Sequence, residues 1–247
     1  MQPLTAQEVL QLWERGAGRA AAERAFLLLA RARADLGVEA LTEMTVGQSE
    51  AALLDMRVSM FGRRLSAVDN CPACATTVEV EVDAAALATA QAPSAASNAV
   101  GSIEIDNWKL ALRAPTIGDL IAIGGEEDAS MARILLLERC LPHARTPAGD
   151  PCPVLALPPE VQAKAVQAIE ERDPAAQLTT TLECPDCHHS WQAVLSIAAY
   201  LWTEIAASAR RLLREVHELA IRYGWSEDAI LGLSATRRHA YLAGLSA

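Results

Sequence analysis

The sequence predicts an α+β protein that is mostly helical and carries small β-hairpins. Aromatic residues make up only 4% of the chain and alanine is abundant, so aliphatic side chains on closely packed helices must supply most of the burial. Two short segments instead alternate β-branched and charged or polar residues with the period of a strand. Near the C-terminus, apolar residues recur at three- and four-residue spacing over a long stretch. This stretch predicts one long amphipathic helix.

The charge balance narrows the classes of partner. The chain of 247 residues has a formal net charge of −10. Because an acidic chain repels phosphate backbones, we do not expect a nucleic acid as the default partner. No apolar run approaches the roughly 20 residues that span a bilayer, and the first residues carry neither a basic nor an apolar leader segment. We therefore expect a cytoplasmic protein that does not contact a membrane.

Residues 1–66 are predicted to form a helical region. Thr5 precedes the apolar periodicity of residues 6–15, and its hydroxyl can cap that helix. Two further helices are expected, each with a glycine at its end that favours termination. They are residues 19–35, before Gly37, and residues 53–61, before Gly62.

The middle of the chain has a mixed character. Residues 76–82 (TTVEVEV) alternate like a half-buried strand. Residues 84–102 are rich in Ala, Ser and Gln, which is typical of a mobile linker or a poorly anchored helix. Alternation resumes at residues 103–113, where Asp106 and Asn107 tolerate left-handed backbone geometry and predict a hairpin turn.

The second half of the chain is predicted to contain several short helices and a proline-rich loop before its long helix. Short helices are expected at residues 116–123 and 130–141, and half of the twelve prolines then predict a loop over residues 142–159. Another helix is expected over residues 159–171, with proline at its start.

A C-terminal helical tail is predicted over residues 197–247. Gly224 is expected to end its long helix, and Ser226 and Ser234 can cap two short helices after it. The apolar stripe of the long helix consists of Leu201, Ile205, Ser208, Leu212, Val216, Leu219 and Tyr223.

Four of the six cysteines form two Cys-x-x-Cys pairs, which predict one structural zinc ion. A tight turn of this type presents two thiolates to one metal, and two such turns complete a tetrahedral four-cysteine site. The two cysteines outside these pairs, Cys140 and Cys152, are interpreted as packed or loop residues. The expected metal ligands are Cys71, Cys74, Cys184 and Cys187.

The two pairs resemble each other in sequence, which favours a split zinc ribbon. They read CPAC and CPDC, and a strand-like run follows each. The expected halves are residues 67–83 and 178–196, with residues 84–177 as an insertion between them. Closing so long a loop costs about 4 kcal/mol, whereas structural zinc contributes roughly 10–16 kcal/mol. The metal is therefore expected to hold together two distant parts of the chain.

The residues after the second cysteine of each pair depart from the usual pattern. Zinc knuckles often carry glycine there, where the backbone tends toward positive φ, but this chain has Ala75 and His188. His188 or His189 can also replace a cysteine ligand, although a solvent-facing role is the favoured interpretation for both.

Two other functions compete with a structural metal. CPAC and CPDC also look like dithiol active sites of the thioredoxin type, but that type places the motif before a long helix, and strand-like residues follow both motifs here. A nucleic-acid-binding regulator is the main alternative, with Arg237, Arg238 and His239 on a DNA-reading helix. Common signatures of phosphate-binding loops, zinc proteases and serine hydrolases are missing from the sequence. We therefore expect that the chain is not an enzyme.

Several segments together resemble one family. They are the CPAC knuckle with its strand, LRAPTIGDL at residues 112–120, the CPDC knuckle, and the tail with its core LLREVHELAIRYGWSEDAIL. The set is similar to the baseplate hub assembly chaperone family of T-even phages, as found in phage-tail-like contractile injection systems. The similarity extends in scattered blocks over the chain, and the tail is its most specific part.

The resemblance implies a non-enzymatic function. A protein of this kind is encoded with a contractile tail apparatus and helps its baseplate or hub proteins to assemble, or serves as an accessory structural protein. It implies no catalytic residues and no small-molecule substrate. It implies the tail as a surface for partners, and the four cysteines as zinc ligands.

Overall fold

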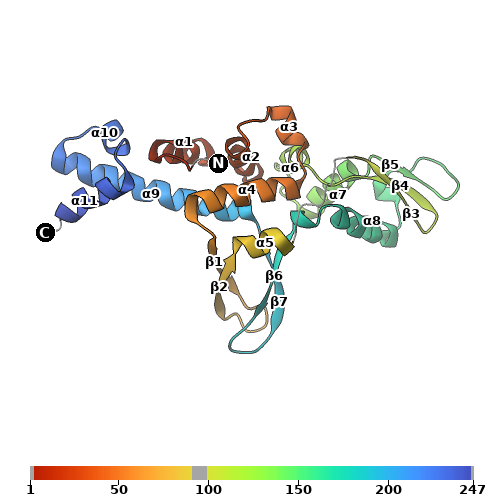
Figure 1. Ribbon diagram of the computed structural model, residues 1–247. Helices are drawn as coiled ribbons and strands as arrows, with labels where there is room; N and C mark the ends of the chain where they lie inside the picture. The colour runs from red at the N-terminus through yellow and green to blue at the C-terminus, as the bar shows by residue number, and fades with distance from the viewer. Residues whose placement is uncertain (1–2, 91–98, 246–247) are drawn as a thin grey trace.

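The computed structural model describes residues 3–90 and 99–245, and it is mostly helical with small antiparallel sheets (Figure 1). This outcome confirms the coarse fold class. The α-helices are α1 (Ala6–Gly16), α2 (Ala21–Ala32), α3 (Val38–Glu43), α4 (Val46–Phe61), α5 (Ala84–Ala90), α6 (Ile117–Ile123), α7 (Ala129–Cys140), α8 (Pro159–Arg172), α9 (Ile197–Tyr223), α10 (Glu227–Leu231) and α11 (Ala235–Leu245). The strands are β1 (Arg64–Asn70), β2 (Thr77–Asp83), β3 (Gly101–Ile105), β4 (Trp108–Leu112), β5 (His143–Arg145), β6 (Leu178–Glu183) and β7 (Ser190–Leu195).

The long helix α9 is the axis of the fold. It packs against α1, α2 and α4 along one side and against α10 and α11 near its C-terminal end. The predicted apolar stripe supplies this contact, since Leu201, Ile205 and Leu219 are fully buried. Packing against three neighbouring helices therefore stabilises α9 far more than helix propensity alone.

The N-terminal helices agree with the prediction in part: the start of α1 and the end of α4 are confirmed, whereas α3 was not predicted and α4 begins at Val46 rather than at residue 53. Thr5 caps α1, and its hydroxyl accepts a hydrogen bond from the Glu8 N–H. Gly62 ends α4 with φ 85°, a conformation that glycine adopts without steric cost. The role predicted for Gly37 was wrong, because this residue precedes the first turn of α3 as its N-cap.

Two hairpins project from the helical layer, side by side in Figure 1. Strand β1 pairs with β2, and β6 pairs with β7, each in a separate antiparallel sheet of two strands. The sequence prediction missed β1, which begins at Arg64 inside the region expected to be helical. Leu65 and Ala67 alternate with polar Arg64 and Ser66, and pairing with β2 makes this short pattern a strand.

Residues 84–102 were predicted as a linker or a poorly anchored helix. The structure forms helix α5 at the start of this range, and the side chains of Ala84 and Leu87 are buried in the first hydrophobic core, which the N-terminal helices form with α9. Residues 91–98 lie outside the described residues, so the linker prediction for them has no structural outcome. Strand β3 begins at Gly101.

A second hydrophobic core lies between the three-stranded sheet β3-β4-β5 and helices α7 and α8, at one end of the molecule (Figure 1). The predicted hairpin turn is confirmed, with φ 50° at Asp106 and φ 66° at Asn107. The prediction of an unstructured loop at residues 142–159 was incomplete. That segment contains β5, which pairs with β4, and a short 3-10 helix at Val154–Ala156.

The C-terminal caps are confirmed. Gly224 ends α9 in the left-handed conformation, and the Ser226 and Ser234 hydroxyls accept backbone hydrogen bonds at the starts of α10 and α11. Within the part of the chain that the structure describes, no helix combines the length and apolar character needed to cross a membrane.

Candidate metal centre

The four predicted metal ligands meet at the tips of the two hairpins. Cys71 and Cys74 lie in the turn between β1 and β2, and Cys184 and Cys187 lie in the turn between β6 and β7. All four Sγ atoms lie within 4.8 Å of one another. The Sγ atoms of Cys71 and Cys187 are 3.6 Å apart, and those of Cys74 and Cys184 are 3.5 Å apart.

The two turns have the same backbone hydrogen bonds. In the first, the Ala75 N–H donates to the Cys71 carbonyl at 2.8 Å, and in the second the His188 N–H donates to the Cys184 carbonyl at 3.0 Å. The first cysteine of each turn also donates its N–H to the carbonyl five residues later, at Thr76 and at His189. The hairpins therefore present their thiols with the same local geometry.

The residue after the second cysteine adopts the left-handed region in both turns. The φ angle is 61° at Ala75 and 57° at His188. This result confirms the predicted backbone geometry at the two positions where glycine is commonly found. A residue with a Cβ pays a steric cost there, so both turns hold a conformation that the local sequence disfavours.

Side-chain contacts join the two hairpins next to the thiols. The Thr76 hydroxyl donates to the Asp186 carboxylate at 2.7 Å, and the Trp191 indole N–H donates to the Asp69 carboxylate at 3.0 Å. Each contact links β1–β2 to β6–β7 across more than a hundred residues of sequence. The thiol cluster is therefore part of a larger contact between the hairpins.

The base of the first hairpin is tied to the helical layer. The Tyr200 hydroxyl on α9 accepts a hydrogen bond from the Ser66 N–H at 3.0 Å and donates to the Ser66 carbonyl at 2.8 Å. The hairpin is thus fixed at both ends, by Tyr200 at its base and by the second hairpin at its tip.

The thiols differ in their environment. Cys71 and Cys184 are buried, whereas Cys74 and Cys187 are exposed. The Thr76 hydroxyl and backbone N–H lower the pKa of Cys74 to about 6. At Cys187 the backbone N–H of His189 lowers the pKa, but the three neighbouring thiols and desolvation together outweigh it and raise the pKa to about 12. Four adjacent thiolates repel one another, so a bound cation is needed to keep all four ionised.

The donor set and its geometry suit a tetrahedral metal ion. Zn–S bonds of about 2.3 Å in a tetrahedron place the sulfurs about 3.8 Å apart. The two short Sγ separations, 3.6 and 3.5 Å, are close to that spacing. The cluster contains only cysteine ligands among the residues that the structure describes, so the four thiols can hold one metal ion between them.

The two histidines beside the second turn lie outside the cluster. The His188 ring is exposed, with Nδ1 3.3 Å from the Glu183 carboxylate, and the His189 ring stacks on Trp191. The other two cysteines are also separate from the cluster: Cys140 is buried in the second core and Cys152 packs against it.

The basic residues considered for DNA binding are largely occupied. Arg238 is buried and donates from Nε to the Glu215 carboxylate at 2.8 Å, and the His239 ring lies 3.3 Å from the same carboxylate. Arg237 is exposed. Since Glu215 lies on α9, these contacts attach α11 to the long helix.

Comparisons of the chain with protein-family models, with curated proteins and with solved structures gave no match. What the thiols can bind therefore follows from their own geometry.

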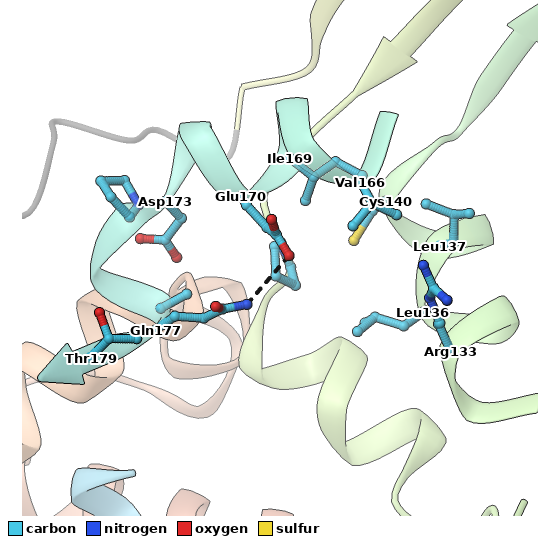
Figure 2. Close-up of a pocket in the computed structure, with 13 residues that line it drawn as sticks. Arg133, Leu136, Leu137, Cys140, Val166, Ile169, Glu170, Asp173, Gln177 and Thr179 are labelled. Carbon is cyan, nitrogen blue, oxygen red and sulfur yellow. Dashed lines mark hydrogen bonds between the residues drawn. The ribbon is translucent and has the colours of Figure 1, made fainter. Parts of the chain in front are cut away.

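A cavity of about 630 Å³ lies apart from the thiols, between α7, α8 and the segment that leads into β6 (Figure 2). Its wall includes the buried side chains of Leu137, Cys140 and Ile169. Burial raises the pKa of Cys140 to about 11, so this thiol is neutral at physiological pH. The Asp173 carboxylate is occupied, since it accepts the Gly47 N–H at 2.8 Å. The cavity is therefore mainly an apolar recess between the two cores.

Proposed function

We propose that the four cysteines bind one structural zinc ion and that the two hairpins are the halves of a split zinc ribbon. The observation that carries this proposal is the convergence of four thiols within 4.8 Å from two turns with the same backbone hydrogen bonds. Zinc favours this donor set in four-coordinate structural sites. Four thiolates fill its coordination shell and leave no position for a catalytic water, so the role proposed for the metal is structural.

We further propose that the zinc-stapled chain is a non-enzymatic assembly factor or accessory structural protein of a contractile, phage-tail-like injection system. Its partners are then baseplate or hub proteins. Support comes from the resemblance of the two knuckles, LRAPTIGDL and the tail to the baseplate hub assembly chaperone family. This role involves no small-molecule substrate.

The segments that carry the resemblance belong to the framework of the fold. The LRAPTIGDL segment packs against the start of α4, where the Val46 N–H donates to the Pro115 carbonyl and the Ile117 N–H donates to the Met44 carbonyl. The tail contains most of α9, and the knuckles form the thiol cluster. These segments therefore help to hold the helices and hairpins in their relative positions.

A deletion and complementation experiment tests the assembly role. The chain is deleted from a strain that carries the whole tail gene cluster, and sheathed particles are counted by electron microscopy. We expect the deletion to abolish or strongly reduce them and the wild-type chain or the Cys152→Ser variant to restore them. Sheathed, contractile particles at normal yield in the deletion strain would show that the assembly role is wrong.

A further inference from the structure

Helix α9 has an exposed side that the fold leaves open. Its opposite side is buried against α1, α2 and α4 and, near the C-terminal end, against α10 and α11, while a stripe of side chains along its C-terminal half faces solvent. Four of its residues follow one another at four-, three- and four-residue spacing, and a fifth lies beside them. Together they span about 16 Å of helix. We call the stripe the outer face of α9, and it consists of Arg210, Leu213, Arg214, His217 and Ile221.

The outer face carries positive charge that the described chain does not neutralise. Arg210 and Arg214 are one turn apart, and neither forms an ion pair or hydrogen bond through its side chain with any described residue. Like charges at this spacing destabilise a helix slightly. Some exposed arginines elsewhere have carboxylate partners, such as Arg33 with Asp35, and others, such as Arg222 and Arg237, have no ion pair among the described residues. Arg210 and Arg214 thus place two adjacent unpaired positive charges on one side of α9, on a chain whose net charge is −10.

Two large apolar side chains lie among these charges. Ile221 is 68% exposed and Leu213 is 39% exposed. They are eight residues apart, so both project from the same side of the helix. Single exposed apolar residues are common on protein surfaces, but here the two alternate with unpaired arginines along three turns. Exposed apolar side chains next to arginines are typical of protein interfaces.

We propose that the outer face of α9 docks an amphipathic helix of a partner protein that carries acidic residues beside its apolar stripe. A helix offers apolar and charged side chains at the same three- and four-residue spacing as the outer face. Leu213 and Ile221 would pack against its apolar residues, and Arg210 and Arg214 would pair with its carboxylates. A nucleic acid is the poorer fit, because phosphates give no contact for these two apolar side chains and the chain as a whole is acidic.

The inference names the chemistry of the partner and rests on the proposed function only for the identity of that partner. The attraction follows from the charge and exposure of the outer face, whichever assembly it serves.

Site-specific photocrosslinking in the producing strain tests the docking. The full chain carries the photoreactive residue in His217→p-benzoylphenylalanine, and Arg222→p-benzoylphenylalanine, off the outer face, is the matched control. We expect position 217 to crosslink to one protein, at a helical segment with acidic residues beside an apolar stripe, and position 222 to give much less product. Equal yields, no product at position 217, or a product with nucleic acid or a second copy of this chain would overturn the proposal.

Charge reversal separates docking from folding and from the assembly role. The double variant Arg210→Glu with Arg214→Glu should lose the crosslink at position 217, while the double variant Arg222→Glu with Arg237→Glu, which changes the net charge equally, should keep it. Equal circular dichroism spectra exclude misfolding. A crosslink that survives the first pair overturns the docking. If the crosslinked partner is unrelated to the tail apparatus, the docking stands and the assembly role fails; if deletion blocks assembly but no crosslink forms, the reverse holds.

Discussion

The buried carboxylate of Glu50 on α4 accepts a hydrogen bond of 2.6 Å from the backbone N–H of Ile197, the first residue of α9. The backbone N–H of Ala199, in the first turn of the same helix, donates to the Ser196 hydroxyl. Burial nevertheless raises the pKa of Glu50 from its ordinary value of 4.5 to about 7, although the N–H groups of Ile197 and Ala198 lower it. The start of the central helix is therefore joined to a carboxyl group that titrates near neutral pH.

Glu50 should make the stability of the fold depend on pH. Its folded-state pKa is raised, so the favourable contribution of the protonated carboxyl is complete below about pH 4.5 and is lost as the pH rises through about 7. We expect a loss of about 3 kcal/mol across this range. Glu50→Gln should flatten this part of the pH profile in urea unfolding followed by tryptophan fluorescence. A variant with the slope of the wild type between about pH 4.5 and 7 would contradict this assignment.

The ion pair of Arg57 with Glu204 should contribute strongly to stability. Arg57 is buried, donates to both carboxylate oxygens at 2.9 and 2.7 Å, and also donates to the Gly62 carbonyl at 2.7 Å. Arg57→Ala leaves these acceptors without their donor and should lower the free energy of unfolding by about 3 kcal/mol. The control Arg63→Ala removes an exposed pair with Asp83 and should cost less than about 1 kcal/mol. Equal losses of unfolding free energy in the two variants would show that the buried ion pair contributes no more than the exposed one.

The left-handed residues of the two turns should respond to glycine. Ala75 has φ 61°, so Ala75→Gly is expected to raise the free energy of unfolding of the metal-loaded protein by about 1 kcal/mol. The control Ala207→Gly lies on the exposed side of α9 and should lower it by a similar amount, because glycine weakens a helix interior. Chemical denaturation at a fixed zinc concentration measures both, and a destabilised Ala75→Gly variant would argue against the turn geometry.

A single ligand substitution should separate the two hairpins. Cys184→Ser removes a buried thiol of the cluster, and loss of a structural metal is expected to cost more than about 4 kcal/mol. The control Cys152→Ser changes a half-buried cysteine outside the cluster and should cost about 1 kcal/mol or less. Limited proteolysis with mass spectrometry should show faster cleavage in both hairpins only in Cys184→Ser. A variant that stays folded and retains its metal would contradict a four-cysteine site.

The sequence predicted best where local chemistry decides the structure. The caps at Thr5 and Ser226 and the turn at Asp106 and Asn107 each depend on neighbouring residues alone. The four cysteines could be grouped because two Cys-x-x-Cys pairs are a common spacing of structural zinc ligands. Their spatial convergence in the structure agrees with that grouping.

The missed elements depend on partners outside their own segments. Strand β1 has only a short alternation at Leu65 and Ala67, and it becomes a strand because β2 pairs with it. Strand β5 lies in a proline-rich segment and is held by pairing with β4. The hydrogen bond from the first residue of α9 to Glu50 on α4 joins residues that are 147 positions apart. No local pattern in the sequence indicates this contact. The sequence did contain one indication of β1. A strand was predicted after the Cys71–Cys74 turn, and a hairpin built on that turn needs a second strand before it.

Elemental analysis of the purified chain tests the central proposal most directly. The protein is expressed in cells without added metal, purified without chelators, and measured for zinc, iron and other transition metals alongside the Cys184→Ser and Cys152→Ser variants. We expect about one zinc ion per chain in the wild type and in Cys152→Ser, released on denaturation or thiol modification, and background zinc in Cys184→Ser. A folded wild-type chain that contains no zinc, or that holds the same zinc after loss of Cys184, would contradict the zinc staple.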